Sequence, residues 1–144
     1  MHRSTGLARF SKPQPCNNEV NTMPILIAAL MMTASLHLSI KTDGGFTGRG
    51  VGQLSIDGDK ATTERCEGTI TAEERQQLIA AISSAKKLKW SESYGIAHPD
   101  AVRWTLQTAG RTTSWYDGND LPKELQELRD LAWKVRGRVV SECK

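Results

Sequence analysis

The chain has 144 residues, 38% hydrophobic and 24% charged, a composition typical of one globular domain rather than of a disordered segment. The formal net charge is +3, but three of the 19 basic residues and only one of the 16 acidic residues precede position 36. The rest of the chain is close to neutral. Charge therefore does not support a nucleic-acid-binding function, and we expect no nucleic-acid partner.

Residues 1–35 have the order of a secretory signal. A polar, weakly basic stretch leads into the uncharged apolar run that begins with "MPILIAALMM", and the small residues Thr33 and Ser35 follow. This order predicts a signal peptide over 1–35, a mature start near Leu36 and a secreted or periplasmic location. The run is too short for a membrane span, so we expect no stable span after the leader is removed.

Two alternatives stay open for this segment. Met23 is a second possible initiator, which would leave almost no basic region before the apolar run. In the other alternative, residues 25–40 are a buried strand or helix of the folded domain. Residues 23–40 would then not be a signal peptide, and the protein would be cytoplasmic.

Three cysteines bear on the compartment. Cys16 lies in the predicted leader, which leaves Cys66 and Cys143 as an even pair that can form a disulfide in an oxidising environment. Two free thiols in a cytosolic protein are the alternative. The cysteines and histidines do not have the spacing of a zinc site, so we expect no metal ligands.

Strands joined by turns are predicted at the start of the domain. "LHLSIK" at 36–41 alternates apolar and polar residues, as does "VGQLSID" at 51–57, where Leu54 and Ile56 are expected to face the core. The glycine-rich stretch "TDGGFTGRG" at 42–50 connects them. "DGDK" is a hairpin-turn signal, after which "ATTERC" returns as a strand at 61–66.

A helix is predicted from Thr71 onward. Thr71 followed three residues later by Glu74 is a capping box, and Leu78, Ile82 and Ala85 recur at helical spacing. Basic residues gather near the end of this helix, where the helix dipole favours cations.

A second hairpin over 101–116 and a second helix complete the pattern. We expect Asp120 to cap this helix and Pro122 to lie in its first turn. A continuous apolar stripe follows the helix: Leu121, Leu125, Leu128, Ala132, Val135 and Val139. The fold class predicted for 36–144 is therefore α+β, an antiparallel sheet of about four to five strands with two amphipathic helices on one face.

The pattern offers little for catalysis. His98 is the only histidine well inside the predicted domain, and it lies in a loop before Pro99. The glycine run leads into a strand rather than a helix and has no following Lys-Ser/Thr, so it does not suit a nucleotide. We expect no catalytic residues, no cofactor and no enzymatic activity.

Several motifs resemble emfourin-type proteins, which are proteinaceous inhibitors of thermolysin-like metalloproteases. These are a strand followed by a polar residue and Gly-Gly-Phe-small-Gly, then Pro99-Asp100, "VRWTL", a turn with "GR", and "LPKELQELRDL". The resemblance covers roughly 38–133. Two features depart from the family pattern. Asp43 stands where the family favours serine, and the leader and Cys66/Cys143 are additional.

The resemblance implies a protease-binding loop and a thermolysin-like metalloprotease as partner. The loop residues are Thr42, Asp43, Gly44, Gly45, Phe46, Thr47 and Gly48, which we expect to be exposed. Phe46 would fill an apolar specificity pocket, Asp43 would place a carboxylate near the zinc, and Gly44 and Gly45 would allow close backbone approach to the cleft.

The alternative for this stretch is a plain strand connection. In it Phe46 folds back onto the core and the glycines supply positive φ. The protein would then be an exported interaction or structural module of the cell envelope without a protease target. An exposed Phe46 favours the inhibitor, and a buried Phe46 favours the module.

Overall fold

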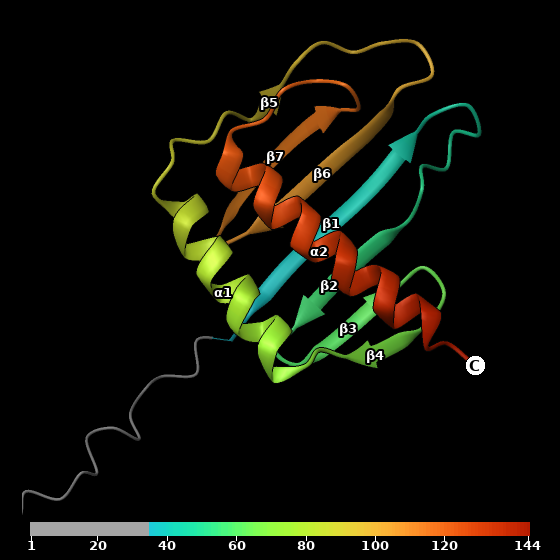
Figure 1. Ribbon diagram of the computed structural model, residues 1–144. Coiled ribbons are helices and arrows are strands. Elements are labelled where there is room, and N and C mark those ends of the chain that lie inside the picture. Colours follow the sequence, from blue (N-terminus) through green and yellow to red (C-terminus); the bar gives the residue numbers. More distant parts are fainter. Residues whose placement is uncertain (1–34) are drawn as a thin grey trace, which may run out of the picture. The chain divides into compact units, whose positions relative to one another are not determined.

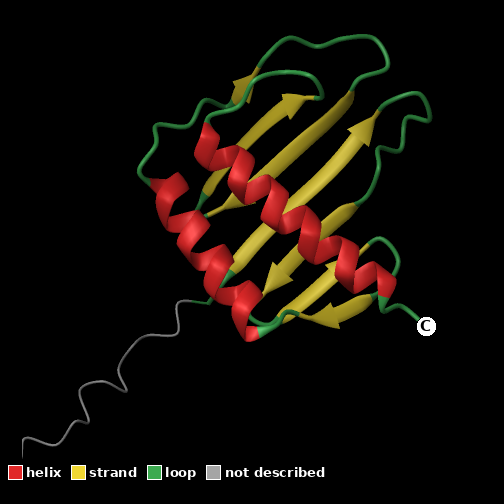
Figure 2. Ribbon diagram, in the orientation of Figure 1, coloured by secondary structure: helices red, strands yellow, loops and turns green. Residues whose placement is uncertain are grey.

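In the computed structural model, which describes residues 35–144, a seven-stranded sheet packs through one face against two helices (Figure 1). Figure 2 shows both helices in red on the same side of the yellow sheet. The strand order is β4-β3-β2-β1-β6-β7-β5. In chain order the elements are β1 (His37–Gly44), β2 (Gln53–Asp57), β3 (Lys60–Thr63), β4 (Glu67–Thr69), α1 (Ala72–Lys86), β5 (Ser93–Tyr94), β6 (Val102–Thr108), β7 (Arg111–Tyr116) and α2 (Lys123–Ser141).

The α+β class with two helices on one face is confirmed, but the sheet differs from the prediction. It has seven strands rather than four to five, and it is mixed because β5 runs parallel to β7. The extra strands, β4 and β5, have three and two residues. Such short segments carry no readable alternation, so the sequence pattern did not reveal them.

The predicted strand over 61–66 is also shorter than expected. β3 ends at Thr63, whose hydroxyl accepts hydrogen bonds from the amides of Arg65 and Cys66 at 3.2 and 3.1 Å. This side-chain-to-backbone turn is one that Thr forms readily, and it sends the chain back as β4.

The core lies between the sheet and the helices. Leu54 and Ile56 face it as predicted, and every residue of the predicted α2 stripe is buried. Trp104 stacks on Trp115 with ring centroids 6.0 Å apart, and Trp133 of α2 meets Trp104 edge-on at 4.6 Å. These aromatic contacts join the sheet to α2.

The two helices begin differently. The predicted capping box of α1 is present, with Glu74 N donating to Thr71 Oγ1 at 3.1 Å and Thr71 N donating to Glu74 Oε2 at 2.9 Å. At α2 the N-cap is Pro122, and no side chain caps it, so the prediction that Asp120 is the cap was wrong. Asp120 lies two residues too early for its carboxylate to occupy the capping position.

A disulfide and an ion pair hold the C-terminal end of α2. Cys66 and Cys143 are joined as a disulfide, as predicted for an oxidising compartment, with their Cα atoms 6.1 Å apart. Nearby, Arg138 donates to both carboxylate oxygens of Glu74, at 2.6 and 2.8 Å. Both contacts bind α2 to segments far away in the sequence.

The predicted signal peptide lies outside the described residues, apart from Ser35. Within residues 35–144, neither helix combines the length and the apolar character that crossing a membrane requires.

Candidate functional site

Three loops gather at one end of the sheet, here called the loop end (Figure 1). They are the β1–β2 loop (45–52), the β5–β6 loop (95–101) and the β7–α2 loop (117–122). Hydrogen bonds join them, since Gly45 N donates to Ala101 O at 3.1 Å and Asn119 Nδ2 donates to Ile96 O at 3.3 Å. The predicted Gly-Gly-Phe loop is therefore part of a connected surface.

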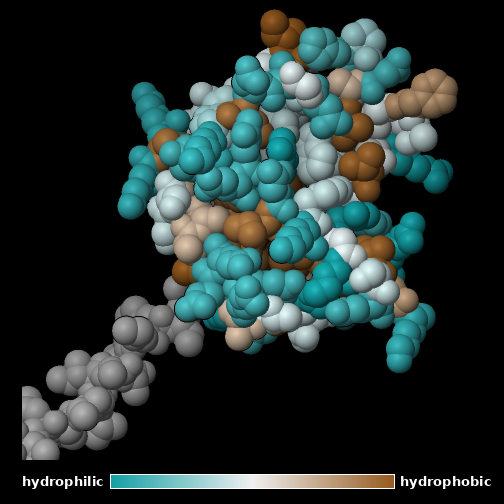
Figure 3. All heavy atoms as spheres, viewed as in Figure 1, coloured by the Kyte–Doolittle hydropathy of each residue, from teal (hydrophilic) through white to brown (hydrophobic). Residues whose placement is uncertain are grey.

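Large hydrophobic side chains are exposed at the loop end. Phe46 is 94% exposed, Ile96 75% and Val51 53%, whereas the remaining exposed large hydrophobic residue of 35–144, Ile79, lies on α1. Figure 3 shows hydrophobic side chains projecting among hydrophilic ones where these loops lie. The alternative in which Phe46 folds back onto the core is wrong.

The base of the β1–β2 loop is held by Thr42. Its Oγ1 accepts hydrogen bonds from the amides of Val51 and Gly52 at 2.8 and 2.9 Å and donates to Gly52 O at 2.6 Å. The expectation that all of 42–48 is exposed was wrong at Thr42, which is 9% exposed because its hydroxyl is turned inward to make these bonds. It was also wrong at Gly44 and Gly45, which are half-buried. Thr42 therefore positions the loop from its base.

Gly44 and Gly45 make a close approach inside the chain. Both have positive φ, 78° and 71°. A Cβ on Gly44 would lie 3.1 Å from Ala101 O, and one on Gly45 would lie 3.0 Å from a Val102 methyl group. The missing side chains thus let the loop pack against the start of β6 in a conformation that other residues rarely adopt.

Backbone hydrogen bonds brace the tip of the loop. Gly48 N donates to Gly45 O at 3.1 Å, and Gly50 N donates to Gly44 O at 2.9 Å. Exposed Thr47 accepts from Arg49 N at 3.4 Å. Phe46 therefore projects into solvent from a turn whose two sides are bonded to each other.

Asp43 lies at the end of β1, beside the loop and not at its tip. It is exposed and pairs in register with Arg103 of β6. Because side chains alternate along a strand, Asp43 points away from the helices while Thr42 points toward them. Its proposed place near a partner's zinc stays a prediction.

Beside the loop base is a polar groove of about 470 Å³, here called the basic groove. Its charged residues are Arg49 of the β1–β2 loop, Glu64 and Arg65 of the β3–β4 turn, and Arg136 of α2. Partial burial by itself would raise the pKa of Glu64, but hydrogen bonds from the Arg136 guanidinium and the Gln53 amide outweigh it, and the pKa is lowered. Glu64 is therefore ionised at neutral pH and binds the loop base to α2.

Sequence reasoning missed the basic groove. Its charged residues come from three segments, and Glu64 and Arg136 are 72 positions apart. Scattered arginines in a sequence are ordinarily surface residues. Neither periodicity nor spacing indicates that Arg49, Arg65 and Arg136 lie around one groove.

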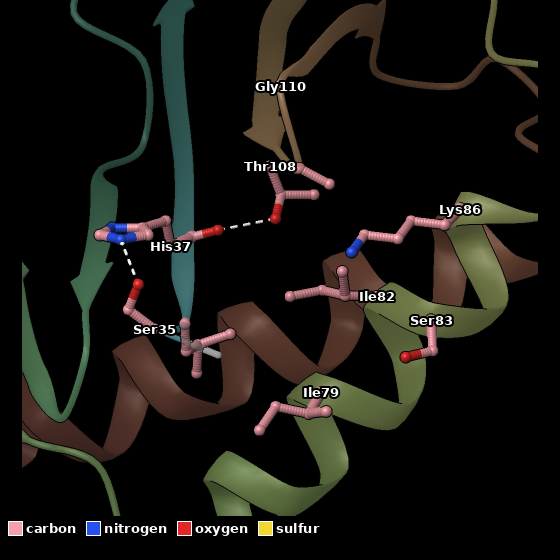
Figure 4. Close-up of a pocket in the computed structure, with 10 residues that line it drawn as sticks. Ser35, His37, Ile79, Ile82, Ser83, Lys86, Thr108 and Gly110 are labelled. Carbon is pink, nitrogen blue, oxygen red and sulfur yellow. Dashed lines mark hydrogen bonds between the residues drawn. The ribbon is translucent and has the colours of Figure 1, made fainter. Parts of the chain in front are cut away.

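A second cavity, of about 290 Å³, lies where the described chain begins. Figure 4 shows Ile79, Ile82 and Lys86 of α1 on one side of it, with His37 and Thr108 on the other. Thr108 Oγ1 donates to His37 O at 2.7 Å and so joins β6 to β1. This cavity is at the opposite end of β1 from Phe46.

His98, the histidine weighed as a catalytic candidate, is exposed in the β5–β6 loop. Among residues 35–144, there is no group of three or more His, Cys, Asp or Glu side chains with the arrangement of a metal site.

Comparison with known proteins finds no relative of this chain. No protein-family model matches the chain, and neither a curated protein nor a solved structure matches it. The likeness to emfourin-type inhibitors consequently depends on the sequence motifs alone.

Proposed function

We propose that the chain is a proteinaceous inhibitor of a thermolysin-like metalloprotease and that it inserts the Gly-Gly-Phe loop at the protease cleft. The observation that carries the proposal is the exposure of Phe46, 94% of whose surface is open to solvent on a braced loop. Burying such a ring in a partner's pocket is strongly favourable, and large aromatic side chains supply much of the energy at protein interfaces.

The bracing of the loop supports the same function. The three hydrogen bonds of Thr42 and the contacts of Gly44 and Gly45 with β6 order the loop before a partner arrives. A loop that is already ordered loses less conformational entropy on binding, so more of the contact energy appears as affinity.

The disulfide supports a secreted or periplasmic location. Disulfides form and persist in oxidising compartments and are rare in the cytosol. We therefore propose that the protein acts outside the cytoplasm, on a protease that is itself exported.

An inhibition assay tests the function. The full chain is produced in a host that exports and oxidises it, purified, and mixed with a thermolysin-like metalloprotease while hydrolysis of a peptide substrate is followed. We expect inhibition that saturates at equimolar inhibitor and protease. Unimpaired hydrolysis with the folded, oxidised protein in micromolar excess would overturn the proposal for that protease class.

The second candidate is an exported interaction module of the envelope without a protease target. The exposure of Ile96 and Val51 beside Phe46 favours a contact wider than one loop, which suits this function as well. This second function would be supported if the chain bound an envelope protein, if Phe46 were needed for that binding, and if the chain inhibited no thermolysin-like protease.

A further inference from the structure

We propose that the basic groove is a carboxylate-binding subsite that receives an Asp or Glu side chain of the partner protein whose pocket receives Phe46. The inference rests on the proposed function because it assigns a second contact to the same partner. It adds the chemistry of that contact, an acidic side chain next to an apolar pocket.

The charges of the groove favour an anion. Three guanidinium groups line it, and Glu64 is the one carboxylate among its lining residues. That carboxylate is already engaged, since Glu64 Oε2 accepts from Gln53 N at 2.9 Å and from Arg136 Nε at 3.2 Å. Within residues 35–144, Arg49 and Arg65 take part in no ion pair. The groove therefore has unbalanced positive charge, which attracts and orients an acidic group.

Arg136 gives the groove a fixed wall. Its side chain is only 15% exposed, and its guanidinium lies 4.6 Å from the centre of the Trp133 ring while it pairs with Glu64. Gly52 leaves room for this guanidinium, because a Cβ at position 52 would collide with it. One of the three arginines is thus held in place before any ligand binds, which lowers the entropic cost of binding.

Arg49 and Arg65 complete the groove from two loops. Both are exposed, and they approach from the β1–β2 loop and the β3–β4 turn. The planar fork of an arginine matches the two oxygens of a carboxylate, which it binds through two parallel hydrogen bonds. A carboxylate is therefore the ligand that this geometry suits.

The groove adjoins the surface on which Phe46 is exposed. Arg49 follows Phe46 by three residues in the same loop, a reach of about 10 Å at most. A partner that encloses the Phe46 ring consequently brings its surface over Arg49. Asp43 does not neutralise the groove, since it lies on the opposite face of β1 and is not among the lining residues.

Charge-removing variants test the subsite in the complex. Arg49→Gln and Arg65→Gln are expected to weaken inhibition of the protease by about three- to fivefold each, as exposed ion pairs do. Lys134→Gln, which removes one positive charge from α2 outside the groove, is the matched control and should leave inhibition unchanged. Salt should weaken inhibition by the wild type more than by the double variant Arg49→Gln/Arg65→Gln. Equal inhibition by the wild type and the double variant would overturn the subsite while the inhibitory function stands.

The free protein provides a test that does not need a protease. Titration with glutarate, a dicarboxylate, is followed through the Nε–H NMR signals of the arginine side chains. We expect the Arg49, Arg65 and Arg136 signals to shift, and the Arg136 shift to disappear in the double variant but persist in Lys134→Gln. If these signals stay unmoved at tens of millimolar glutarate, or respond more strongly to inorganic phosphate, the carboxylate subsite is wrong whether or not the protein inhibits a protease.

Discussion

Thr42 and Gly52 are joined by three hydrogen bonds across the base of the β1–β2 loop. Thr42 N and Thr42 Oγ1 both donate to Gly52 O, at 3.1 and 2.6 Å, and Gly52 N donates back to Oγ1 at 2.9 Å. A single buried hydroxyl takes part in two of these bonds and helps to close the loop from which Phe46 projects, so the presentation of Phe46 depends on a residue that is itself buried.

The first prediction concerns this hydroxyl. Thr42→Val keeps the shape of the side chain but leaves the Val51 and Gly52 amides without their acceptor, which should cost about 2 kcal/mol of unfolding free energy. Inhibition should weaken as well because the loop loses its bracing. Thr42→Ser keeps the hydroxyl and should retain most of the stability and the inhibition. Denaturant melts and inhibition constants are the measurements. If Thr42→Val matches wild type in both stability and inhibition, the hydrogen bonds of the Thr42 hydroxyl are unimportant for the loop.

Truncation of Phe46 is the second prediction. Since the ring is 94% exposed, Phe46→Ala should leave the free energy of unfolding unchanged within error. Inhibition should weaken by roughly 2 kcal/mol or more, about thirtyfold, because the ring is the expected anchor in the partner's pocket. Ile79→Ala, an exposed hydrophobic residue on α1, serves as the control with unchanged inhibition. If Phe46→Ala inhibits as strongly as wild type, the loop is not the binding element.

The third prediction concerns the disulfide between Cys66 and Cys143. It closes a loop with a sequence separation of 77 residues, so its removal should lower stability by up to about 4 kcal/mol on the chain-entropy model. The double variant Cys66→Ser/Cys143→Ser should show this loss in a denaturant melt. In wild type, added reductant should produce a similar loss. Mass spectrometry of the exported protein should find no free thiol at either position, and two free thiols would contradict the pairing.

The fourth prediction follows from the pKa of Glu74. The Arg138 guanidinium lowers this pKa below its ordinary value of 4.5, against the opposing effect of partial burial. A carboxylate whose pKa is lower in the folded state stabilises the fold above its unfolded pKa, and this contribution is lost as the pH falls through the folded pKa. Wild type should therefore lose stability as the pH is lowered from about 4.5. Glu74→Gln, which retains a capping-box residue, should be less stable at pH 7. Its free energy of unfolding should fall less steeply than that of wild type as the pH is lowered. Denaturant melts at a series of acid pH values measure this. If the free energy of unfolding falls equally steeply in the two proteins, Glu74 is not a source of the pH dependence.

The fifth prediction concerns the mature N-terminus. If residues 1–35 are a signal peptide, protein recovered from the exporting host should begin close to Leu36. Leu36 is buried and its carbonyl accepts from Gly58 N at 2.8 Å, so a start well beyond it would remove core contacts. N-terminal sequencing decides this, and a soluble protein that begins at Met1 or Met23 would refute export by this route.

The sequence alone predicted the elements whose residues repeat over many positions. The alternation around Leu54 and Ile56 and the stripe of α2 follow from the period of the backbone in a strand and a helix, and the capping box at Thr71 joins residues three positions apart. Local patterns therefore suffice to reveal them. The position of the Gly-Gly-Phe loop between the first two strands was predictable for the same reason. The parallel pairing of β5 with β7 was not, because two residues carry no period.

Only the tertiary structure decided how the candidate site is assembled. β1 pairs with β2 on one side and β6 on the other, which brings the Phe46 loop beside Ala101 and Val102 and gives Gly44 and Gly45 their role inside the chain. The position of α2 across the sheet places Arg136 against Gly52 and next to Glu64. These contacts join residues far apart in the sequence, and they depend on packing between layers, which no local pattern records. The sequence therefore specified where the Gly-Gly-Phe loop lies, whereas the tertiary structure decided that Phe46 projects from it and that α2 forms the charged groove beside it.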